Sequence, residues 1–421
     1  MQKYRELWKE LGVDLELHEE LMKELSDLHE KTHLSQKNRP GAMKRFDRFL
    51  HDSHGKRVEQ IKKYRDGGGK SIGTFCIYIP DEIAFAADVL AIPLCGGSGW
   101  AVSHADKMLP RDICPLVRST FGMSMSGTCP YKKLKDFAVG ETTCDAKKKA
   151  WDLFGFKVLE VPQKKENRDR ELWLSEVHDF RKMMENLSGT RVTEKKLKDS
   201  IMLMNRKRTL LEEINLFRKS ENPPISGLDA LLVSQAALGM DVAEFIDAAA
   251  QLLSELEIRA GQDISSYRQP GKRILMAGSP SPLGNAKVHY IVESSGLRIV
   301  ADESCTGIRY YRDKVKENGE DVNEMIEAIA DRYFSIDCSC FSPNTERINN
   351  LLKIVDEYRI DGVVQNILQY CQTYNIEARR IEKELKKVNI PSITIETDYS
   401  SEDIGQIRTR IEAFAEMLEE R

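Results

Sequence analysis

The sequence predicts an α/β protein with two parallel-sheet domains that face each other across a cleft. Short apolar runs alternate with helical patterns in two separate stretches of the chain, as expected for β-α-β units. A long stretch of helical pattern lies between them. The chain of 421 residues is also too long for one ordinary hydrophobic core, and it suits two or three domains.

Four segments are predicted. Residues 1–70 form an N-terminal helical segment, because leucines recur there at helical spacing among charged residues. The first α/β domain covers residues 71–165, and a second helical segment covers residues 166–268. Residues 269–421 form the second α/β domain, which ends in a helix. Glycine-rich and proline-glycine turns, Asp66-Gly67-Gly68-Gly69 and Gln269-Pro270-Gly271, mark the start of each α/β domain.

The first α/β domain has a strand, a short helix and a second strand in GTFCIYIP, DEIAFAADVL and AIPLCGG. The pattern continues through DFAVGETTC and FKVLEVP. Neither glycine cluster in this part fits a nucleotide motif. Gly69-Lys70-Ser71 lacks the first glycine of a Walker A motif, because Tyr64 stands there, and the third glycine of a dinucleotide fingerprint is replaced by Val102.

The second α/β domain has the same alternation of strands and helices, but its sequence does not closely repeat that of the first. KRILMAGSP is a predicted strand, LGNAKVHYIVESSG a helix and LRIVADESC a strand. RYFSID, DGVVQNIL and PSITIETDYS are read as further strands, and residues 404–420 as the closing helix. Both domains are therefore predicted to be flavodoxin-like, with helices on the two faces of a parallel sheet.

Composition excludes several classes of protein. A hydrophobic content of 41%, a charged content of 31% and a net charge of −4 are typical of a soluble globular protein and argue against phosphate-driven nucleic-acid binding. The N-terminus has no signal-peptide pattern, and no apolar run approaches the roughly 20 residues that span a membrane. We therefore expect a cytoplasmic protein, in which nine cysteines indicate metal or redox chemistry instead of disulfides.

Three cysteines recur at equal steps of fifteen residues, at Cys114, Cys129 and Cys144. The first two precede proline, which is favoured at the first position of a helix, so each thiol is predicted at a helix N-cap. Lys147, Lys148 and Lys149 add positive charge beside Cys144. A single free cysteine is usually a small buried apolar residue. Three thiols in such surroundings, which favour the thiolate, indicate a polynuclear thiolate site.

The spacing of the cysteines favours iron–sulfur chemistry over zinc. No Cys-x-x-Cys pair occurs, which argues against zinc ribbons and ferredoxin-type motifs. Zinc often recruits histidine, yet of the eight histidines only His104 is close to a cysteine in sequence. The other cysteines mostly follow predicted strands, where open α/β sheets bind ligands. Thiolates from dispersed loops suit an iron–sulfur cluster in a cleft between the domains.

Several motifs resemble the 2-hydroxyacyl-CoA dehydratase family. They are Cys114-Pro115, ETTCDAKKK at 141–149, DGVV at 361–364 leading to Cys371, and ETDYS at 396–400. The resemblance runs in order from Ser71 to the last helix, although the family usually has glycine where this chain has Ala146. It implies an oxygen-sensitive cluster in a cleft between two α/β domains. It also implies that Cys114, Cys144 and Cys371 are the thiolates of one cubane.

The additional cysteines resemble the branch of this family that carries a double-cubane cluster, written [8Fe-9S], on six cysteines. This resemblance rests on Cys76, Cys95 and Cys129 and on CSCFSPN at 338–344. It implies Cys76, Cys129 and Cys340 for the second cubane, with Cys305 as the nearest substitute and a weaker case for Cys95. Cys338 and Cys340 are expected on the same side of an extended segment, so spacing alone does not choose between them.

The same resemblance implies a function and partners. A separate ATP-hydrolysing iron–sulfur activator would deliver low-potential electrons, and the cluster would reduce a small molecule. Candidate proton donors are His104, Glu141 and Tyr370. A homodimer is expected, because one chain carries enough thiolates for the whole cluster. The alternatives are a 2-hydroxyacyl-CoA dehydratase component with a single [4Fe-4S] cluster and an electron-transfer scaffold without a substrate.

Overall fold

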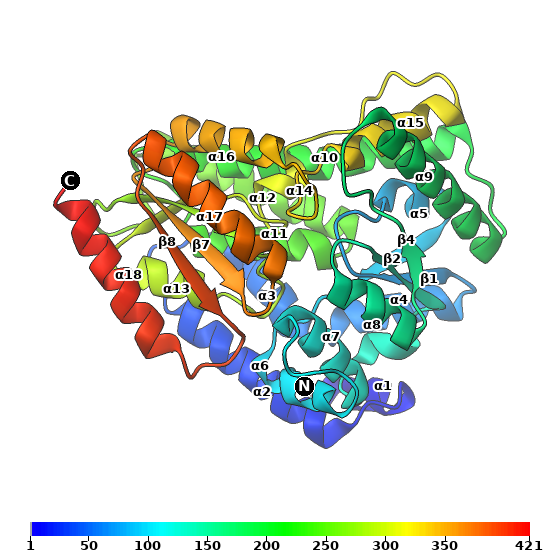
Figure 1. Ribbon diagram of the computed structural model, residues 1–421. Coiled ribbons are helices and arrows are strands. Elements are labelled where there is room, and N and C mark those ends of the chain that lie inside the picture. Colours follow the sequence, from blue (N-terminus) through cyan, green and yellow to red (C-terminus); the bar gives the residue numbers. More distant parts are fainter. Residues whose placement is uncertain (1) are drawn as a thin grey trace.

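The computed structural model describes residues 2–421 and contains two four-stranded sheets, in which every strand pair is parallel. The first sheet has the order β2-β1-β3-β4, with β1 Lys70–Thr74, β2 Val89–Pro93, β3 Phe137–Glu141 and β4 Lys157–Leu159. The second sheet has the order β6-β5-β7-β8, with β5 Arg273–Gly278, β6 Arg298–Asp302, β7 Gly362–Leu368 and β8 Ser392–Thr397. The predicted α/β fold with two parallel sheets is confirmed, and Figure 1 shows the sheets in opposite halves of the molecule.

Burial explains why the central strands have almost no polar side. Every residue of β5, β6 and β7 is buried, as parallel sheets require when helices cover both faces. On one face of the second sheet, α13 (Lys287–Ser294) and α18 (Ile404–Glu419) form a compact apolar cluster with the strands. A larger core joins residues of both sheets through the helices between them, so the two halves share one packed interior.

The helices of the first half surround the first sheet and supply the N-terminal layer. Those near the N-terminus are α1 Arg5–Glu10, α2 Leu15–His29, α3 Lys44–Asp52 and α4 Lys56–Asp66. Those among the strands are α5 Asp81–Ala86, α6 Gly99–Val102, α7 Pro115–Met125 and α8 Asp145–Phe154. Helices α7 and α8 each begin directly after a cysteine.

The second helical segment connects the two sheets. It consists of α9 Asn167–Ser188, α10 Glu194–Leu216, α11 Gly227–Gly239 and α12 Val242–Gly261. Helix α10 packs against α5 of the first half and against α14 (Ile308–Tyr311) and α15 (Val322–Phe334) of the second. Helix α11 is mostly apolar and buried along nearly its whole length, which is typical of a central helix. The remaining helices are α16 Thr345–Glu357 and α17 Gln372–Lys387. Across residues 2–421, none of the helices combines the length and the apolar character that crossing a membrane requires.

Three of the element predictions differ from the structure. GTFCIYIP, predicted as a strand, contributes only Gly73 and Thr74 to β1, and residues 75–80 form a turn and irregular loop. RYFSID, which was predicted as a strand before Cys338, is instead the end of α15 and the turn after it. The buried residues Met325, Ile329 and Tyr333 recur at helical spacing along α15, a period that the last six residues alone do not reveal. The helix predicted over DEIAFAADVL ends at Ala86, because Asp88 adopts a positive φ of 56° and β2 starts at Val89. The division into four segments stays a prediction.

A buried histidine pair makes the N-terminal layer sensitive to acid. His18 Nε2 lies 3.0 Å from His54 Nδ1, and Trp8 covers His18 with a ring-centroid distance of 4.3 Å. Burial lowers the pKa of His18 to about 4 and that of His54 to about 3. Both rings are therefore neutral in the folded protein at neutral pH, whereas the unfolded chain takes up protons below about pH 6.5.

We predict that the folded state loses stability as the pH falls from about 6.5 toward 4. The slope is about 1.4 kcal/mol per pH unit for each proton that the unfolded chain binds in excess. Urea unfolding at several pH values measures it. The variant His54→Gln should show a shallower slope, whereas His51→Gln, an exposed histidine of α3, should keep the parent slope. Equal slopes in all three proteins would contradict this assignment.

Candidate metal centre

A cavity of about 680 Å³ lies where the loops of the two halves meet, and all nine cysteines line it. The cavity follows from the strand directions, because parallel strands place the loops after their carboxyl ends at one edge of the sheet. Cys76 follows β1, Cys95 follows β2 and Cys305 follows β6 by two or three residues. The nine thiols are all free, so the cavity wall offers sulfur ligands from both halves of the chain.

Three cysteines lie at the start of a helix, which the sequence predicted for Cys114 but not for Cys371. Cys114, Cys144 and Cys371 are the N-caps of α7, α8 and α17, and none of their side chains makes a capping hydrogen bond. Burial raises the pKa of Cys114 to about 12, and the nearby Cys371 and Cys144 add to that rise. The three thiols therefore lie close enough to one another to interact electrostatically.

A second group of thiols comes from the other parts of the wall. Burial raises the pKa of Cys76 well above its ordinary value, and Cys305 and Cys338 are among the nearby groups that contribute. Cys338 and Cys340 form a close pair in which the hydrogen bond from Cys340 lowers the pKa of Cys338. Arg309 Nη1 also donates a hydrogen bond to Cys305 Sγ over 3.5 Å.

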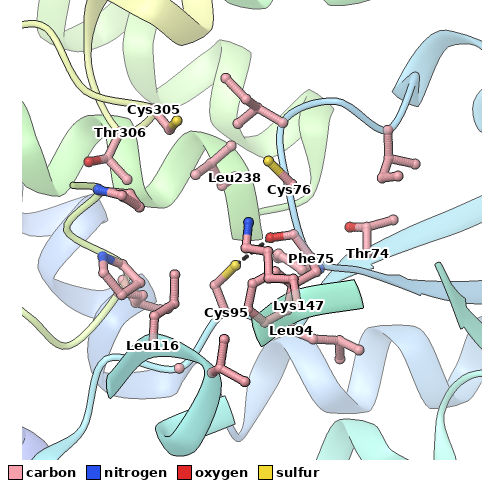
Figure 2. A pocket seen from close by; sticks show the side chains of 18 of the residues that line it. Thr74, Phe75, Cys76, Leu94, Cys95, Leu116, Lys147, Leu238, Cys305 and Thr306 are labelled. Atoms are coloured by element: carbon pink, nitrogen blue, oxygen red, sulfur yellow. Dashed lines mark hydrogen bonds between the residues drawn. The ribbon is translucent and has the colours of Figure 1, made fainter. Parts of the chain in front are cut away.

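The remaining two cysteines are placed differently. Cys95 Sγ donates a hydrogen bond to the carbonyl of Phe75 over 2.6 Å, which Figure 2 marks as a dashed line. Cys129 starts the short 3₁₀ helix Pro130–Lys133. After burial, the groups that affect the pKa of Cys129 are the backbone N–H groups of Tyr131 and Lys132 and the ammonium groups of Lys135 and Lys132. No cysteine is among these strongest influences on its pKa, although Cys129 lines the same cavity.

Lys147 brings a positive charge into the middle of the cysteines. In Figure 2 its ammonium group lies between the sulfur atoms of Cys76 and Cys95. Burial opposes this charge, but Glu141 and the thiols of Cys76 and Cys144 hold the pKa of Lys147 well above its usual range. The ammonium forms an ion pair with Glu141 and lies 5.1 Å from the ring centroid of Phe75. A thiolate cluster is anionic, so a buried cation at this position favours it.

A network of buried ion pairs supports the second half of the wall. Arg309 is fully buried and pairs with Glu303 and with Asp337, the latter over 3.0 Å. Its Nη1 also donates to the hydroxyl of Tyr374 over 2.6 Å. Arg347 reaches Glu303 over 2.9 Å, which couples α16 to the same network. These contacts hold Arg309 against Cys305 in one orientation.

The three predicted proton donors are in unlike environments. His104 packs on Trp100, with ring centroids 4.4 Å apart, and is not among the residues that line the cavity. Glu141 is fully buried behind Lys147 and accepts a hydrogen bond from Thr143 over 2.7 Å. Tyr370 lines the cavity and is 43% exposed, which places it at the opening. The structure therefore brings Tyr370 to the cavity and leaves His104 outside it.

The donor set fits a polynuclear group better than a single ion. Within residues 2–421, no three cysteine, histidine or carboxylate side chains converge closely enough to hold one metal ion. The thiols instead surround an open space, and their high pKa values mean that binding a metal would release protons. Thiolates distributed around a space are what an iron–sulfur cluster requires.

Sequence reasoning placed the positive charge of Lys147 beside Cys144 but missed Arg309, which contacts Cys305. For Lys147 a signal existed, because it lies three residues after Cys144 and thus one helical turn along α8. Arg309 carries no such signal, since its partners Glu303, Asp337 and Tyr374 meet it only through the packing of separate elements.

The chain is similar to several known proteins. Residues 76–418 match the family model described as 2-hydroxyglutaryl-CoA dehydratase, D-component. YjiM of Escherichia coli (strain K12), provisionally named a dehydratase subunit, is 37% identical over 369 residues, which are 85% of this chain and 94% of that protein. The (R)-phenyllactyl-CoA dehydratase beta subunit of Clostridium sporogenes is 25% identical over 89% of this chain and 100% of its own length. A subunit of the benzoyl-CoA reductase of Thauera aromatica is 24% identical over 85% of this chain and 92% of its own length.

The ion pair of Lys147 and Glu141 yields a stability test. Lys147→Met leaves a fully buried carboxylate without its cation, so we predict a loss of about 3–5 kcal/mol in the free energy of unfolding of the cluster-free protein. The double variant Lys147→Met/Glu141→Gln should recover most of that loss, because both charges are then absent. Denaturant titration of the parent, single and double variants measures both effects. A double variant no more stable than the single one would show that the pair is not coupled.

Proposed function

The chain belongs to the family of 2-hydroxyglutaryl-CoA dehydratase D-components, and we propose that it is an iron–sulfur reductase with a double-cubane cluster. The observation that carries this proposal is the single cavity lined by nine free cysteines from both halves of the chain. A single cubane with one open iron needs three protein thiolates. This cavity offers several more, which supports a cluster on six cysteines.

We assign Cys114, Cys144 and Cys371 to the first cubane. Each is the N-cap of a helix, where unpaired backbone N–H groups and the helix dipole favour a thiolate. The mutual effect of these thiols on the pKa of Cys114 supports a shared site. The ETTCDAKKK and DGVV motifs of the family resemblance name the same residues.

For the second cubane we propose Cys76, Cys305 and one thiol of the Cys338–Cys340 pair. The sequence-based assignment used Cys76, Cys129 and Cys340, with Cys305 as the substitute. The electrostatic contact of Cys76 with Cys305 and Cys338 favours Cys305, whereas the charged neighbours of Cys129 are lysines. The hydrogen bond that Cys338 accepts from Cys340 makes Cys338 the stronger acid of the pair, but either sulfur remains a candidate.

When bound, such a cluster would supply electrons at low potential to a small molecule inside the cavity. The residues of this chain would bind and orient that molecule and stabilise charge. Lys147 would compensate the negative charge of the thiolates, as would Arg309 through its hydrogen bond to Cys305. Tyr370, at the opening, is the best placed of the predicted proton donors.

The electrons are proposed to come from a separate iron–sulfur activator that hydrolyses ATP. The chain itself has no Walker A motif, which agrees with an external ATPase. A cytoplasmic homodimer under anaerobic conditions is the expected form, since one chain provides enough thiolates for the cluster. The relatives with subunit names act as components of larger enzymes, which also fits a protein partner.

The alternative is a dehydratase component with one [4Fe-4S] cluster. The names of the relatives favour it, because YjiM and the phenyllactyl-CoA protein are both described as dehydratase subunits. In that case the second group of thiols would be structural. A cluster-bearing scaffold without its own substrate is a further alternative, which the residues around the cavity do not specifically favour.

Iron and acid-labile sulfide per chain distinguish these functions in anaerobically purified protein. We expect about eight irons in the parent, falling to about half in Cys305→Ser and staying near eight in Cys129→Ser. The two variants are matched, because both thiols line the same cavity and only one lies beside other cysteines.

Other outcomes of this measurement are informative. A fall in Cys129→Ser alone would restore the ligand set inferred from the sequence. About four irons in the parent, unchanged in both variants, would contradict the double cubane and favour the dehydratase component.

A further inference from the structure

One lysine in the wall of the cavity has no partner. Lys207 projects from α10 and is only 3% exposed, yet it lines the cavity. Among residues 2–421, no acceptor lies within hydrogen-bonding or ion-pairing distance of its ammonium group, which instead lies 5.3 Å from the ring centroid of Tyr310. An unpaired buried ammonium is costly, so such a group generally has a partner that it meets in the working protein.

The neighbouring cations have partners within the protein, although Arg208 Nε and Arg332 Nη1 each lack an acceptor among the described residues. Arg208, the next residue of α10, pairs with Glu82 over 2.6 Å. Arg332 donates to the carbonyls of Asp313 and Tyr310. The nearby carboxyl group of Asp81 makes no ion pair among the described residues, and burial raises its pKa while Lys207 opposes that rise. The charge of Lys207 thus affects the pKa of Asp81, but the two groups form no ion pair.

The local charge is unbalanced in favour of an anion. The charged groups that act on one another here are the cations Lys207, Arg208 and Arg332 and the carboxyl groups of Asp81 and Glu82. Three cations and two carboxylates leave one positive charge in excess. Arg208 and Arg332 are not among the residues that line the cavity, so Lys207 is the cation of this group that a ligand in the cavity can reach. A monoanion would neutralise it, whereas a phosphate dianion would overcompensate.

We propose that Lys207 binds the carboxylate of the molecule that is reduced in this cavity, so that the substrate is a small free monocarboxylic acid. The acyl groups of phenyllactyl-CoA and benzoyl-CoA, in the names of two relatives, carry no carboxylate that could pair with this ammonium, whereas a free acid does. Tyr310 and Tyr333, which line the same part of the cavity, would cover the apolar body of the acid.

The statement that the bound acid is reduced rests on the proposed function. The statement that Lys207 binds it does not, because binding can be measured without turnover. The probes are butyrate and its neutral isostere butyramide, titrated calorimetrically into the iron-loaded protein at low salt. We expect the parent protein to bind butyrate at least about tenfold more tightly than butyramide. Lys207→Met should lose this preference, and Lys207→Arg should keep part of it because the charge remains.

Lys195→Met is the matched control, because Lys195 lies on the same helix with a side chain that is 86% exposed. It should leave the preference of the parent unchanged. Equal affinity for the acid and the amide in the parent protein, or a preference that survives in Lys207→Met, would overturn the proposal. The comparison in the parent protein also decides the question if Lys207→Met fails to fold.

The iron content and the midpoint potential of the cluster in the same preparations distinguish the remaining roles of Lys207 and the type of cluster. If Lys207 served only as a counter-charge to the cluster, Lys207→Met would shift the potential and the parent protein would show no preference for the acid. A preference for butyrate in a protein with about four irons would overturn the double cubane and retain the role of Lys207. About eight irons without that preference would overturn the role of Lys207 alone.

Discussion

The common direction of the strands within each sheet determines where this protein can bind a cofactor. All strand pairs are parallel, so the loops that leave the carboxyl ends of each sheet lie at one edge. The larger core joins the two halves through α10 and its neighbours, which keeps the edges together around one cavity. Cysteines far apart in the chain, such as Cys76 and Cys305, meet for this reason. The strand topology therefore determines where the cavity lies, and the residues of the loops determine what it can bind.

Charge within the cavity is arranged with few exceptions in compensated pairs. Glu141 is paired with Lys147, and Arg309 with Glu303 and Asp337, so these buried groups are neutralised before any cofactor binds. The thiols remain mostly protonated, because burial raises the pKa of Cys76 and Cys114. A metal cluster would replace those protons and gain from the cations that already surround it. Lys207 is the exception, and an unpaired cation in a cavity indicates a ligand with the opposite charge.

Much of the fold was readable from local patterns. The predicted apolar runs overlap all eight strands, and the helical segment between the sheets followed from its 3.6-residue period. The strand predicted at RYFSID was wrong, because the helix that ends there shows its period only over thirteen residues. In the site, the two Cys-Pro pairs predicted helix N-caps at Cys114 and Cys129, and these residues begin α7 and the 3₁₀ helix Pro130–Lys133. The proton donors were less predictable, since His104 is near a cysteine in sequence and yet packs on Trp100 outside the cavity.

The sequence by itself determined the α/β class, the family and the thiol-rich character of the site, because these depend on periodicity, on short motifs and on residue type. Only the tertiary structure decided which thiols are neighbours. Cys129 is fifteen residues from Cys114 in the chain and resembles it locally, but its charged neighbours are lysines. Cys305 comes from the other sheet and lies beside Arg309 and Cys338. Sequence distance does not measure spatial distance when separate sheets deliver the residues, so the packing of the two halves sets the composition of the site.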